Sequence, residues 1–408
     1  MTRREPAIWF GVVLSGGASC LPPFVWPDEI WWLACFWPLH KIGGEDNVGS
    51  AEMTDIRFGF QAAAAGEGVH TDQKLYQELL DDCALGARLG YDAAWLLEHH
   101  FSDYYPTPSP LLLMAHIAAR CPDLSLGTSV LVLPWYHPLR LAEEISMLNS
   151  LTRGTLHLGI GRGTAKMEYD AYCIDMNEGR ARFAEVFGIV EQGLTGKEFT
   201  HRGTFWNIDR PIRLRPEPIQ KPVNFYGAIG SPASAQVMGD LGIAPICLST
   251  FPDGLLIKIL ERWRARAGKK AEGATLPISV KMFIADTDEE ARDLGRRYYP
   301  PYFALQADHY EADSKPWTNI PEYVDFNRMF ANLRKMTNPE NLDPFLDSNL
   351  VGSAETICRR IDSLIALGFN YFMVSSATPG TPVELRRRMM SRFAKDICPR
   401  YSRAMAVA

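Results

Sequence analysis

The stretch VNFYGAIGSPASAQVMGDLGIAPICL, residues 223–248, contains one complete strand–helix–strand unit. Its two ends, Val223–Ala228 and Ala244–Leu248, are short apolar runs typical of buried strands, and Pro232–Leu241 has the spacing of a helix. The proline that opens the helix has no N–H to lose there, and Gly242 follows the helix as a left-handed cap requires. The stretch therefore predicts two parallel strands joined by a crossover helix.

The same alternation recurs in both directions and gives eight strand–helix pairs after Met53. Eight such pairs predict an α/β fold, a (β/α)8 TIM barrel. A doubly wound open sheet is the alternative, although no G-x-G-x-x-G fingerprint follows the first strand. The other predicted strands are Ile56–Gln61, Ala93–Glu98, Leu124–Leu131, Thr155–Gly161, Ile278–Ala285 and Tyr371–Ser375. The other predicted helices are Asp72–Leu89, Pro108–Arg120, Pro138–Leu151, Asn177–Leu194, Gly254–Ala267, Glu289–Tyr299 and Pro382–Ile397.

Two insertions interrupt the alternation. Lys197–Arg215 contains two short β-like runs and predicts a hairpin. Tyr302–Leu350 is long, polar and aromatic, and it lies between the seventh and eighth strand–helix units. Because a loop of that length in a compact domain is usually functional, we expect a cover over a binding site.

Residues 1–52 differ from the rest of the chain. Five of the ten tryptophans lie there, and neither apolar run reaches the ~18–20 residues needed to span a bilayer. Met53 opens a segment that leads directly into the first predicted strand. We expect residues 1–52 to be an extension that is not ordered or that reflects a mis-assigned start, and residues 53–402 to form the barrel domain.

The composition excludes several classes of protein. A formal net charge of -6 argues against the basic surface that nucleic-acid binding needs, so we expect no nucleic-acid and no membrane partner. The eight cysteines are scattered without a C-x-x-C pair, which argues against structural zinc and thioredoxin-type chemistry. Scattered thiols in a large chain are typical of a reducing compartment, so we expect a cytoplasmic protein.

The active sites of such barrels lie at the C-terminal ends of the strands. Glu98, His99 and His100 follow the second strand, and adjacent strand residues point to opposite faces, so only Glu98 and His100 share a side. A metal site that adds His137 or His157 is one possibility, and a purely structural pair is another. We favour the interpretation that one of these histidines acts in acid–base catalysis or as a hydrogen-bonding group, and we predict no metal site.

The ends of the fourth and fifth strands suggest a phosphate site. Gly159, Gly161 and Gly163 remove side chains from one face of the fourth strand, where a flat ring can approach, and Arg162 points to the other side as an anion partner. The fifth strand ends in Gly230-Ser-Pro-Ala-Ser234, which supplies hydroxyls and free N–H groups at a helix start. No G-x-x-x-x-G-K-[ST] motif occurs, so a nucleoside triphosphate is not indicated.

Five motifs together resemble the bacterial luciferase-like flavin-dependent monooxygenases. The likeness runs in order from about Ile56 to Pro399, and residues 1–52 have no counterpart. The motifs are Trp95-Leu-Leu-Glu-His-His-Phe101, His137-Pro-Leu-Arg140 with Ala142-Glu-Glu144, Gly159-Ile-Gly-Arg-Gly163, Asp175-Met-Asn-Glu-Gly-Arg180 and Val351-Gly-Ser353.

The resemblance implies a barrel that binds reduced FMN supplied by a separate NAD(P)H-dependent flavin reductase. In this family O2 adds to the flavin to give a C4a-peroxide, which oxygenates a small organic substrate. Family members dimerise through the region corresponding to Pro108–Leu151, so a homodimer is expected. The substrate stays open among aldehydes, terpenoids, alkanes and nitrogen heterocycles. Two roles are open for the aromatic residues Tyr104, Tyr105, Trp135 and Trp317, which either line an apolar pocket or pack within a loop.

The resemblance also assigns individual residues. His99 matches the family histidine beside the reacting flavin edge, and Arg162 matches the phosphate arginine. Ser231 and Ser234 match the phosphate hydroxyls. Ser129 and Val130 fall where the family has a non-prolyl cis peptide under the isoalloxazine.

The chain departs from luciferase itself at two positions. Gly230, still expected beside the cofactor, replaces a glutamate, and Gly161 replaces a cysteine, which argues against aldehyde-based light emission. Three other functions stay open: hydride transfer with a deazaflavin, a non-catalytic flavin-binding protein, and a metal-dependent barrel hydrolase.

Overall fold

The fold is that of a computed structural model, which describes residues 56–66, 71–218, 222–323, 330 and 332–401. The extension predicted for residues 1–52 lies outside these residues, so what the sequence suggests there stays a prediction. Among the described residues, no helix is long and apolar enough to cross a membrane.

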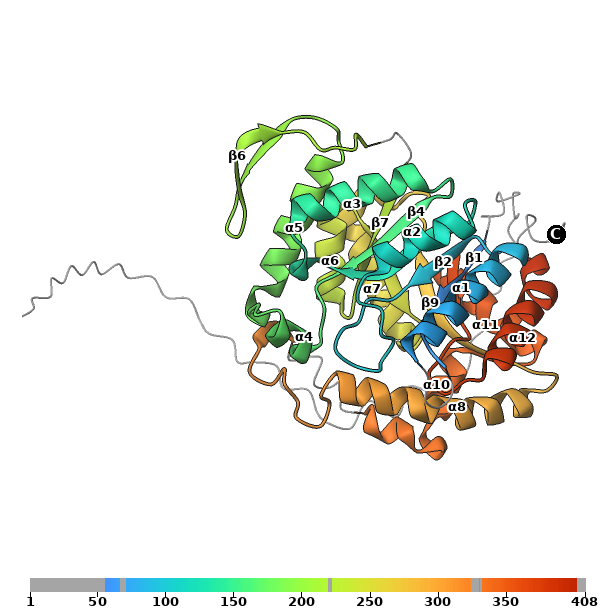
Figure 1. Ribbon diagram of the computed structural model, residues 1–408. Coiled ribbons are helices and arrows are strands. Elements are labelled where there is room, and N and C mark those ends of the chain that lie inside the picture. Colours follow the sequence, from blue (N-terminus) through green and yellow to red (C-terminus); the bar gives the residue numbers. More distant parts are fainter. Residues whose placement is uncertain (1–55, 67–70, 219–221, 324–329, 331, 402–408) are drawn as a thin grey trace, which may run out of the picture. The chain divides into compact units, whose positions relative to one another are not determined.

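Eight parallel strands close into a barrel surrounded by helices (Figure 1). Each strand pairs with the next in the order β1-β2-β3-β4-β7-β8-β9-β11, and β11 pairs with β1, so the predicted barrel is confirmed and the open sheet is wrong. The strands lie within two residues of the predicted runs. They are β1 (Arg57–Ala62), β2 (Ala93–Leu96), β3 (Ser125–Val132), β4 (Leu156–Gly161), β7 (Val223–Ala228), β8 (Ala244–Leu248), β9 (Pro277–Ile284) and β11 (Tyr371–Ser375).

The helices cover the outer face of the barrel, and their ends follow the sequence signals. In α6 (Pro232–Leu241) the proline occupies the first turn and Gly242 takes the left-handed conformation, with φ 69°. The remaining helices are α1 (Asp72–Arg88), α2 (Pro110–Arg120), α3 (Pro138–Leu151), α4 (Lys166–Ala171), α5 (Gly179–Gly193), α7 (Asp253–Ala267), α8 (Asp288–His309), α10 (Asp343–Ser348), α11 (Ala354–Leu367) and α12 (Val383–Asp396).

Helix α8 corrects two predictions. It was expected to end at Tyr299, before Pro300 and Pro301, but it continues through both prolines to His309. A proline inside a helix costs about 3 kcal/mol, and aromatic packing here offsets part of that cost. The rings of Tyr299 and Phe303 each meet Phe345 of α10 edge-on, with ring centroids 4.9 Å apart.

The segment expected to be a loop from Tyr302 to Leu350 is therefore partly regular. It contains the end of α8, short 3-10 turns and α10, and β10 (Leu350–Gly352) pairs with β9 in parallel. The hairpin predicted within Lys197–Arg215 is confirmed as the antiparallel strands β5 (Phe199–Arg202) and β6 (Asn207–Ile212).

The inside of the barrel is filled by stacked layers of side chains, because alternate residues of each strand point inward. The apolar cluster inside the barrel contains Ala93, Trp95, Tyr226, Ile246, Tyr371 and Met373. A further set of residues lies at the C-terminal ends of the strands. We call it the mouth layer; its members are Gln61, Val130, Gly161, Ala228, Leu248, Lys281 and Ser375.

Candidate active site

The mouth layer has two chemically different halves. Strands β3, β4, β7 and β8 contribute small or apolar residues, and Ala228 and Leu248 are exposed, Leu248 by 41 %. Strands β9, β11 and β1 contribute polar side chains that hydrogen-bond one another: Lys281 Nζ donates to Ser375 Oγ at 3.3 Å and to Gln61 Oε1 at 3.2 Å. One half thus offers a flat apolar surface and the other offers a buried amine.

Gly161 keeps the apolar half flat. A Cβ at this position would lie 2.7 Å from Val130 Cγ2 and 3.6 Å from Ala228 Cβ, so the close approach of β3 and β4 leaves no room for a side chain. The peptide bond between Ser129 and Val130 is cis, as the resemblance implied. With Gly161 buried beneath Val130 and beside the exposed Ala228, this half presents a patch of small apolar side chains, which fits a planar ring system such as an isoalloxazine.

Arg162 follows β4 and is held by two groups of the segment after α8. Its guanidinium donates to Glu322 Oε2 at 2.9 Å and to the Glu322 carbonyl at 3.0 Å, and it lies 3.9 Å from the ring centre of Tyr323. The Glu322 carboxylate also accepts a hydrogen bond from Arg180 at 2.8 Å. Two arginines therefore converge on one carboxylate at the end of β4.

Ser231 and Ser234 start helix α6 after β7. Ser231 accepts from the Ser234 N–H, Ser234 accepts from the Ser231 N–H, and the two hydroxyls lie 3.0 Å apart, so Ser231 is the N-cap of α6 and the two serines form a capping box. Ile160 of β4 is level with Gly227 of β7, which places Arg162 and Ser231 beyond the ends of neighbouring strands. The helix start and the arginine are the two donor types that bind a phosphate dianion.

Glu98 and His100 form a buried unit that does not include His99. Glu98 Oε1 lies 3.2 Å from His100 Nε2, and Glu98 Oε2 accepts from the Val132 N–H and the Tyr136 hydroxyl, each at 3.0 Å. The prediction that Glu98 and His100 share a side is confirmed. With its oxygens occupied in this way, Glu98 joins the end of β2 to the end of β3.

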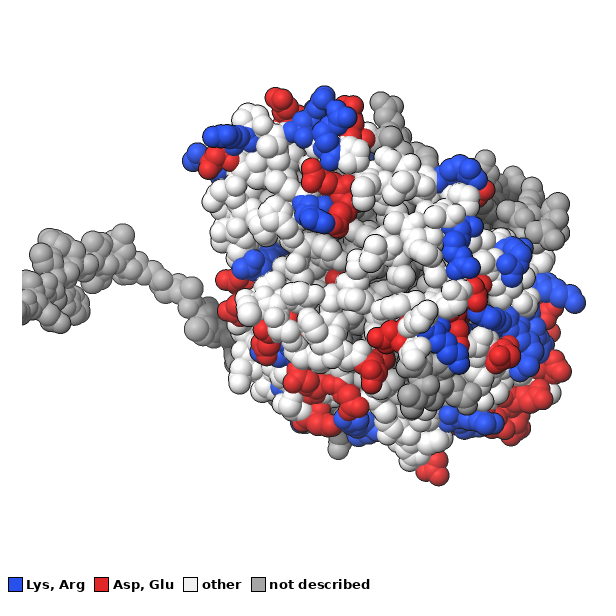
Figure 2. All heavy atoms as spheres, viewed as in Figure 1, with Lys and Arg blue, Asp and Glu red and all other residues white. Residues whose placement is uncertain are grey.

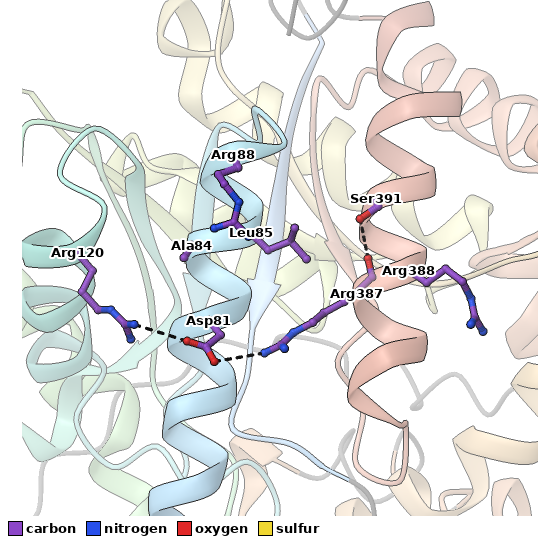
Figure 3. A pocket seen from close by; sticks show the side chains of 8 residues that line it. All are labelled: Asp81, Ala84, Leu85, Arg88, Arg120, Arg387, Arg388 and Ser391. Carbon is purple, nitrogen blue, oxygen red and sulfur yellow. Dashed lines mark hydrogen bonds and ion pairs between the residues drawn. The ribbon is translucent and has the colours of Figure 1, made fainter.

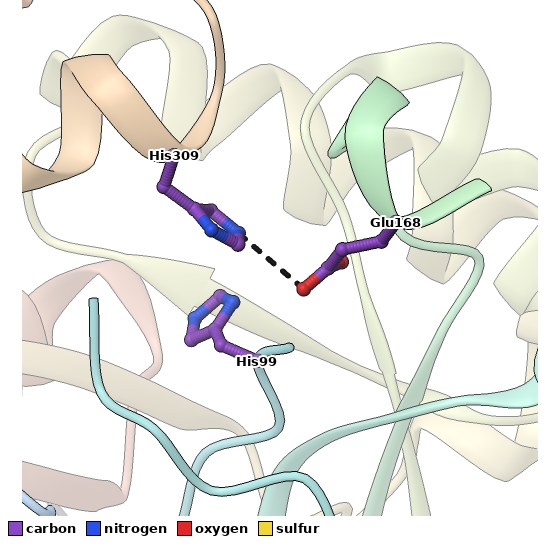
Figure 4. Close-up of side chains that lie close together, drawn as sticks. All are labelled: His99, Glu168 and His309. Atoms are coloured by element: carbon purple, nitrogen blue, oxygen red, sulfur yellow. Dashed lines mark ion pairs between the residues drawn. The ribbon is translucent and has the colours of Figure 1, made fainter. Parts of the chain in front are cut away.

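His99 instead meets His309 and Glu168, two residues that the sequence did not single out as site residues (Figure 4). The rings of His99 and His309 are 4.8 Å apart in an edge-on arrangement, and His309 Nε2 lies 3.5 Å from Glu168 Oε1. Glu168 Oε1 accepts from the His100 N–H at 2.7 Å, and Ser102 Oγ lies 2.7 Å from His309 Nδ1. His309 Nε2 is buried without a hydrogen-bond partner among the described residues.

Burial keeps this cluster uncharged near neutral pH. Burial, reinforced by Glu98, raises the pKa of Glu168 to about 8, so the carboxyl holds its proton. Burial and then His100 lower the pKa of His309 to about 4. Burial, followed by His309, His100 and Lys281, holds the pKa of His99 well below its usual value. His99 is therefore a neutral imidazole, which accepts a proton at one nitrogen and donates at the other.

The structure does not bring together the histidines that the sequence suggested as metal ligands. His137 packs against Trp206 at 4.5 Å, and His157 lies inside the barrel, stacked on Trp95 at 5.5 Å. A different set, His99, Glu168 and His309, has its ligand atoms within 4.8 Å of one another, as a metal site would need.

Sequence reasoning also missed Lys281, although its signal was visible. Pro277–Ile284 reads PISVKMFI, so one lysine interrupts an otherwise apolar run in a barrel strand. Glu168 and His309 had no comparable signal, because only the fold brings them to His99. Of the aromatic residues expected to line a pocket, Tyr104 and Tyr105 contact His99 with ring centroids 4.7 and 6.4 Å away.

A separate groove of about 610 Å³ lies on the outside of the barrel, between α1 and α12 (Figure 3). Four arginines line it, and Asp81 pairs with two of them, Arg120 and Arg387. The groove lies away from the C-terminal ends of the strands, so it is not part of the candidate active site.

Comparison with known sequences shows the family to which the chain belongs. Residues 56–371 match the model of the luciferase-like monooxygenase family. The flavin-dependent trigonelline monooxygenase oxygenase component of Acinetobacter baylyi is 23% identical over 347 residues, 81% of this chain and 91% of the relative. An uncharacterised protein of Sinorhizobium fredii is 37% identical over 160 residues, which are 39% of this chain and 45% of that protein.

Solved structures agree on the fold. Monooxygenase RslO1 from Streptomyces bottropensis has a TM-score of 0.71 at 24% identity, covering 85% of this chain and 100% of its own. The oxygenating constituent of 3,6-diketocamphane monooxygenase from Pseudomonas putida, solved with FMN, has a TM-score of 0.64 at 19% identity, covering 85% and 98%. The coenzyme F420-dependent tetrahydromethanopterin reductase of Methanopyrus kandleri has a TM-score of 0.62 at 15% identity, covering 85% and 100%. With a family model matched over most of its length, the chain belongs to the luciferase-like monooxygenases.

Proposed function

We propose that this protein is the oxygenase component of a two-component flavin-dependent monooxygenase, using reduced FMN and O2 to oxygenate a small organic substrate. The observation that carries the proposal is the patch of small apolar residues Val130, Gly161 and Ala228 at the barrel mouth, in the same ring of strand ends as His99 and Arg162. Such a reaction requires a surface for a flat ring, a site for a phosphate and an acid–base group. The barrel mouth has a feature that matches each of the three.

FMN is held, in this proposal, by residues from three strand ends. Its phosphate lies between Arg162 and the start of α6, beside Gly230, and the hydroxyls of Ser231 and Ser234, which now bond within the capping box, turn to it. Its ring covers the patch next to the Ser129–Val130 peptide bond. When bound in reduced form, the flavin supplies the electrons that activate O2. Glu322 must share or release Arg162 for the phosphate to bind.

His99 is the proposed acid–base residue. Because its ring is neutral at working pH, it either donates a hydrogen bond while it stays uncharged or accepts a proton from a reacting group and becomes a transient imidazolium, which burial disfavours. Glu168, which keeps its proton to about pH 8, lies next to His309 and is a proton source within the same cluster. Buried surroundings of this kind also exclude water from a reactive oxygen species.

The partners follow from the relatives. The Acinetobacter baylyi relative is described as an oxygenase component, which supports a separate flavin reductase that uses NAD(P)H. We further propose that two chains associate as a homodimer and that the protein acts in the cytoplasm.

The test combines binding and turnover. Purified protein is titrated anaerobically with reduced FMN, and oxygen uptake and product formation are then followed with a flavin reductase, NADH and a substrate panel. We expect Arg162→Ala to weaken flavin binding and His99→Ala to keep binding but lose product formation. If no substrate is oxygenated and His99→Ala behaves like the wild type, the proposal fails.

A deazaflavin-dependent hydride transfer is the second candidate, because the Methanopyrus kandleri neighbour uses coenzyme F420, a deazaflavin. Tight deazaflavin binding with negligible FMN binding would favour it. A non-catalytic flavin-binding protein would bind FMN without turnover. A metal centre at His99, Glu168 and His309 would be indicated by stoichiometric zinc or iron in the purified protein that is lost in His309→Ala.

A further inference from the structure

Lys281 is a buried amine without a counter-ion. Its side chain points into the barrel from β9, the residue is 9 % exposed, and no carboxylate of the described residues lies within ion-pair distance of it. Its three hydrogen bonds go to neutral oxygens: Gln61 Oε1 at 3.2 Å, Ser375 Oγ at 3.3 Å and Tyr105 Oη at 3.4 Å.

A lysine in such a place is costly. Lysine is almost never fully buried unless it is paired, and taking an ammonium out of water costs several kcal/mol without a compensating charge. Burial lowers the pKa of Lys281 to about 7, so near neutral pH part of the population carries the charge. A residue that destabilises the fold in this way at the catalytic end of a barrel is a candidate for binding a ligand.

Aromatic rings surround the amine. Tyr302 of α8 lies 4.8 Å from Lys281 Nζ and Tyr105 lies 5.6 Å away, measured to the ring centres. Tyr105 is also stacked near His99, with centroids 6.4 Å apart, so one ring links the amine to the proposed acid–base residue. Flat apolar walls around one positive charge match a flat molecule that carries one negative charge.

The arrangement of the mouth layer separates this place from the flavin. The phosphate donors follow β4 and β7, and the apolar patch of Val130, Gly161 and Ala228 lies on β3, β4 and β7, whereas Lys281, Ser375 and Gln61 belong to the consecutive strands β9, β11 and β1. A ring system that covers the apolar patch leaves the polar half for a second molecule. That molecule would lie between the flavin and His99's tyrosine neighbours.

We propose that Lys281 binds an anionic oxygen of the substrate, so that the enzyme acts on a planar aromatic compound that carries a carboxylate or a phenolate. This inference rests on the proposed monooxygenase function. The hydrogen bond from Lys281 to Tyr105 is the longest of the three and is the one that the anion replaces. Tyr105 and Tyr302 are buried over the amine, so an anion that reaches Lys281 must displace at least one of these two rings.

The test measures binding rather than turnover. The flavin-loaded protein is titrated with benzoate, with 4-nitrophenolate and with benzamide, the neutral counterpart of benzoate, by isothermal calorimetry. We expect at least one of the two anions to bind ten-fold or more tightly than benzamide, and the better anion identifies the group. Lys281→Met, of similar length but neutral, should remove this preference, whereas Lys258→Met on the exposed face of α7 should keep it.

A second variant guards against misfolding of Lys281→Met. Gln61 already accepts from Lys281, so Gln61→Glu places a counter-ion beside the amine with little change of shape. Gln61→Glu should weaken the binding of the anion ten-fold or more, while its affinity for benzamide should stay within two-fold of the wild-type value.

Three outcomes would overturn the inference. Equal binding of benzoate, 4-nitrophenolate and benzamide by the wild type is one, and an unchanged anion preference in a folded Lys281→Met is another. The third is that Lys281→Met weakens the binding of reduced FMN instead, which would show that the amine binds the cofactor. An anion preference in a wild type that binds no flavin would instead reject the proposed function and leave the anion site standing.

Discussion

At the scale of single residues, the space beside Gly161 limits what the barrel mouth can hold. A methyl group there would press on Val130 Cγ2 at 2.7 Å. We expect Gly161→Ala to lower the free energy of unfolding by about 1–3 kcal/mol, as overpacking does, and to weaken FMN binding several-fold. Adding Val130→Ala should restore both, because it removes the clashing methyl.

Gly188 in α5 provides the matched control for this prediction. No atom lies within 4 Å of a Cβ built there, so Gly188→Ala should leave FMN affinity unchanged and stabilise the helix by about 0.5–1 kcal/mol. Both are measured by urea unfolding and flavin titration. FMN affinity that is the same in Gly161→Ala and the wild type would show that the ring does not lie over β4.

Glu322 competes, in our proposal, with the cofactor phosphate for Arg162. Its carboxylate accepts from both Arg162 and Arg180 and is 38 % exposed, so each ion pair is worth about 0.2–1 kcal/mol. We expect Glu322→Gln to tighten FMN binding about two- to five-fold, measured by fluorescence titration. Glu178→Gln, which breaks the ion pair with Arg182 instead, should have no effect. Weaker FMN binding in Glu322→Gln would mean that the carboxylate holds Arg162 in place for the phosphate.

Glu168 should make the protein less stable as the pH rises above neutral. Its folded pKa of about 8 lies above the ordinary value of 4.5, so between these values the folded state holds a proton that the unfolded state has lost. Stability from this group falls with rising pH, by at most about 1.4 kcal/mol per pH unit. His309 acts oppositely, because its folded pKa of about 4 lies below the ordinary 6.5.

The effect of His309 ends near pH 6.5, but above pH 7 Lys281 also opposes Glu168, because its folded pKa of about 7 lies below the ordinary 10.5. The contribution of Glu168 is therefore the difference between Glu168→Gln and the wild type. We expect the unfolding free energy of Glu168→Gln to rise more steeply, or fall less, than that of the wild type between pH 6.5 and 8, and the variant to be the more stable of the two at pH 8. Urea unfolding at pH 6.5, 7.2 and 8 measures the slope, and exposed Glu191→Gln serves as the control. Equal slopes in Glu168→Gln and the wild type would show that the carboxyl ionises normally in the folded protein.

At the scale of elements, α8 joins the stability of the fold to the assembly of the site. Phe345 of α10 is buried and packs against both Tyr299 and Phe303, on either side of the two prolines. We expect Phe345→Ala to cost about 3–5 kcal/mol of unfolding free energy and to loosen the C-terminal half of α8, which carries Tyr302 and His309. Hydrogen exchange should accelerate in that half before the barrel strands.

Phe187→Ala in α5 gives the comparison for this variant. Phe187 is buried against Phe225, 5.4 Å away, so its loss should cost similar stability without selective exchange in α8. Uniform acceleration in both variants would mean that α8 has no stability of its own and opens only with the whole barrel.

The same helix shows where sequence reasoning stops. Strands such as β7 and β8 were predictable to the residue because apolar runs between turn signals are local patterns. His99, Arg162 and Ser231 were identified through motifs at strand ends, whose order the barrel fixes. His309 was not, because local propensity ended the helix at Pro300, and contacts with α10 carry it nine residues further. Lys281 was visible as a residue type, but its lack of a counter-ion depends on every strand around it.

At the scale of the whole molecule, positively and negatively charged side chains are intermixed on the surface, and one region carries few of either. Figure 2 shows Lys and Arg alternating with Asp and Glu around the edge, while the middle of this face has few charged side chains. No single-sign surface suited to nucleic acid is visible there. The pattern agrees with the small net charge of -6.

The apolar side chains exposed on α2 and α3 predict where two copies meet. On α3, Met147 and Leu151 lie one turn apart and are 50 % and 56 % exposed, and Leu112 on the neighbouring helix α2 is 73 % exposed, so both helices present apolar side chains to solvent. We expect Leu112→Glu with Met147→Glu to convert a dimer into a monomer, because both copies must then bury like charges in one interface. Sedimentation at micromolar concentration measures the state, and Ile257→Glu on α7, also exposed at 42 %, should leave the dimer intact. A wild type that sediments as a monomer, or a dimer that tolerates both glutamates, would place these apolar side chains outside any interface and leave their exposure to be explained by another partner.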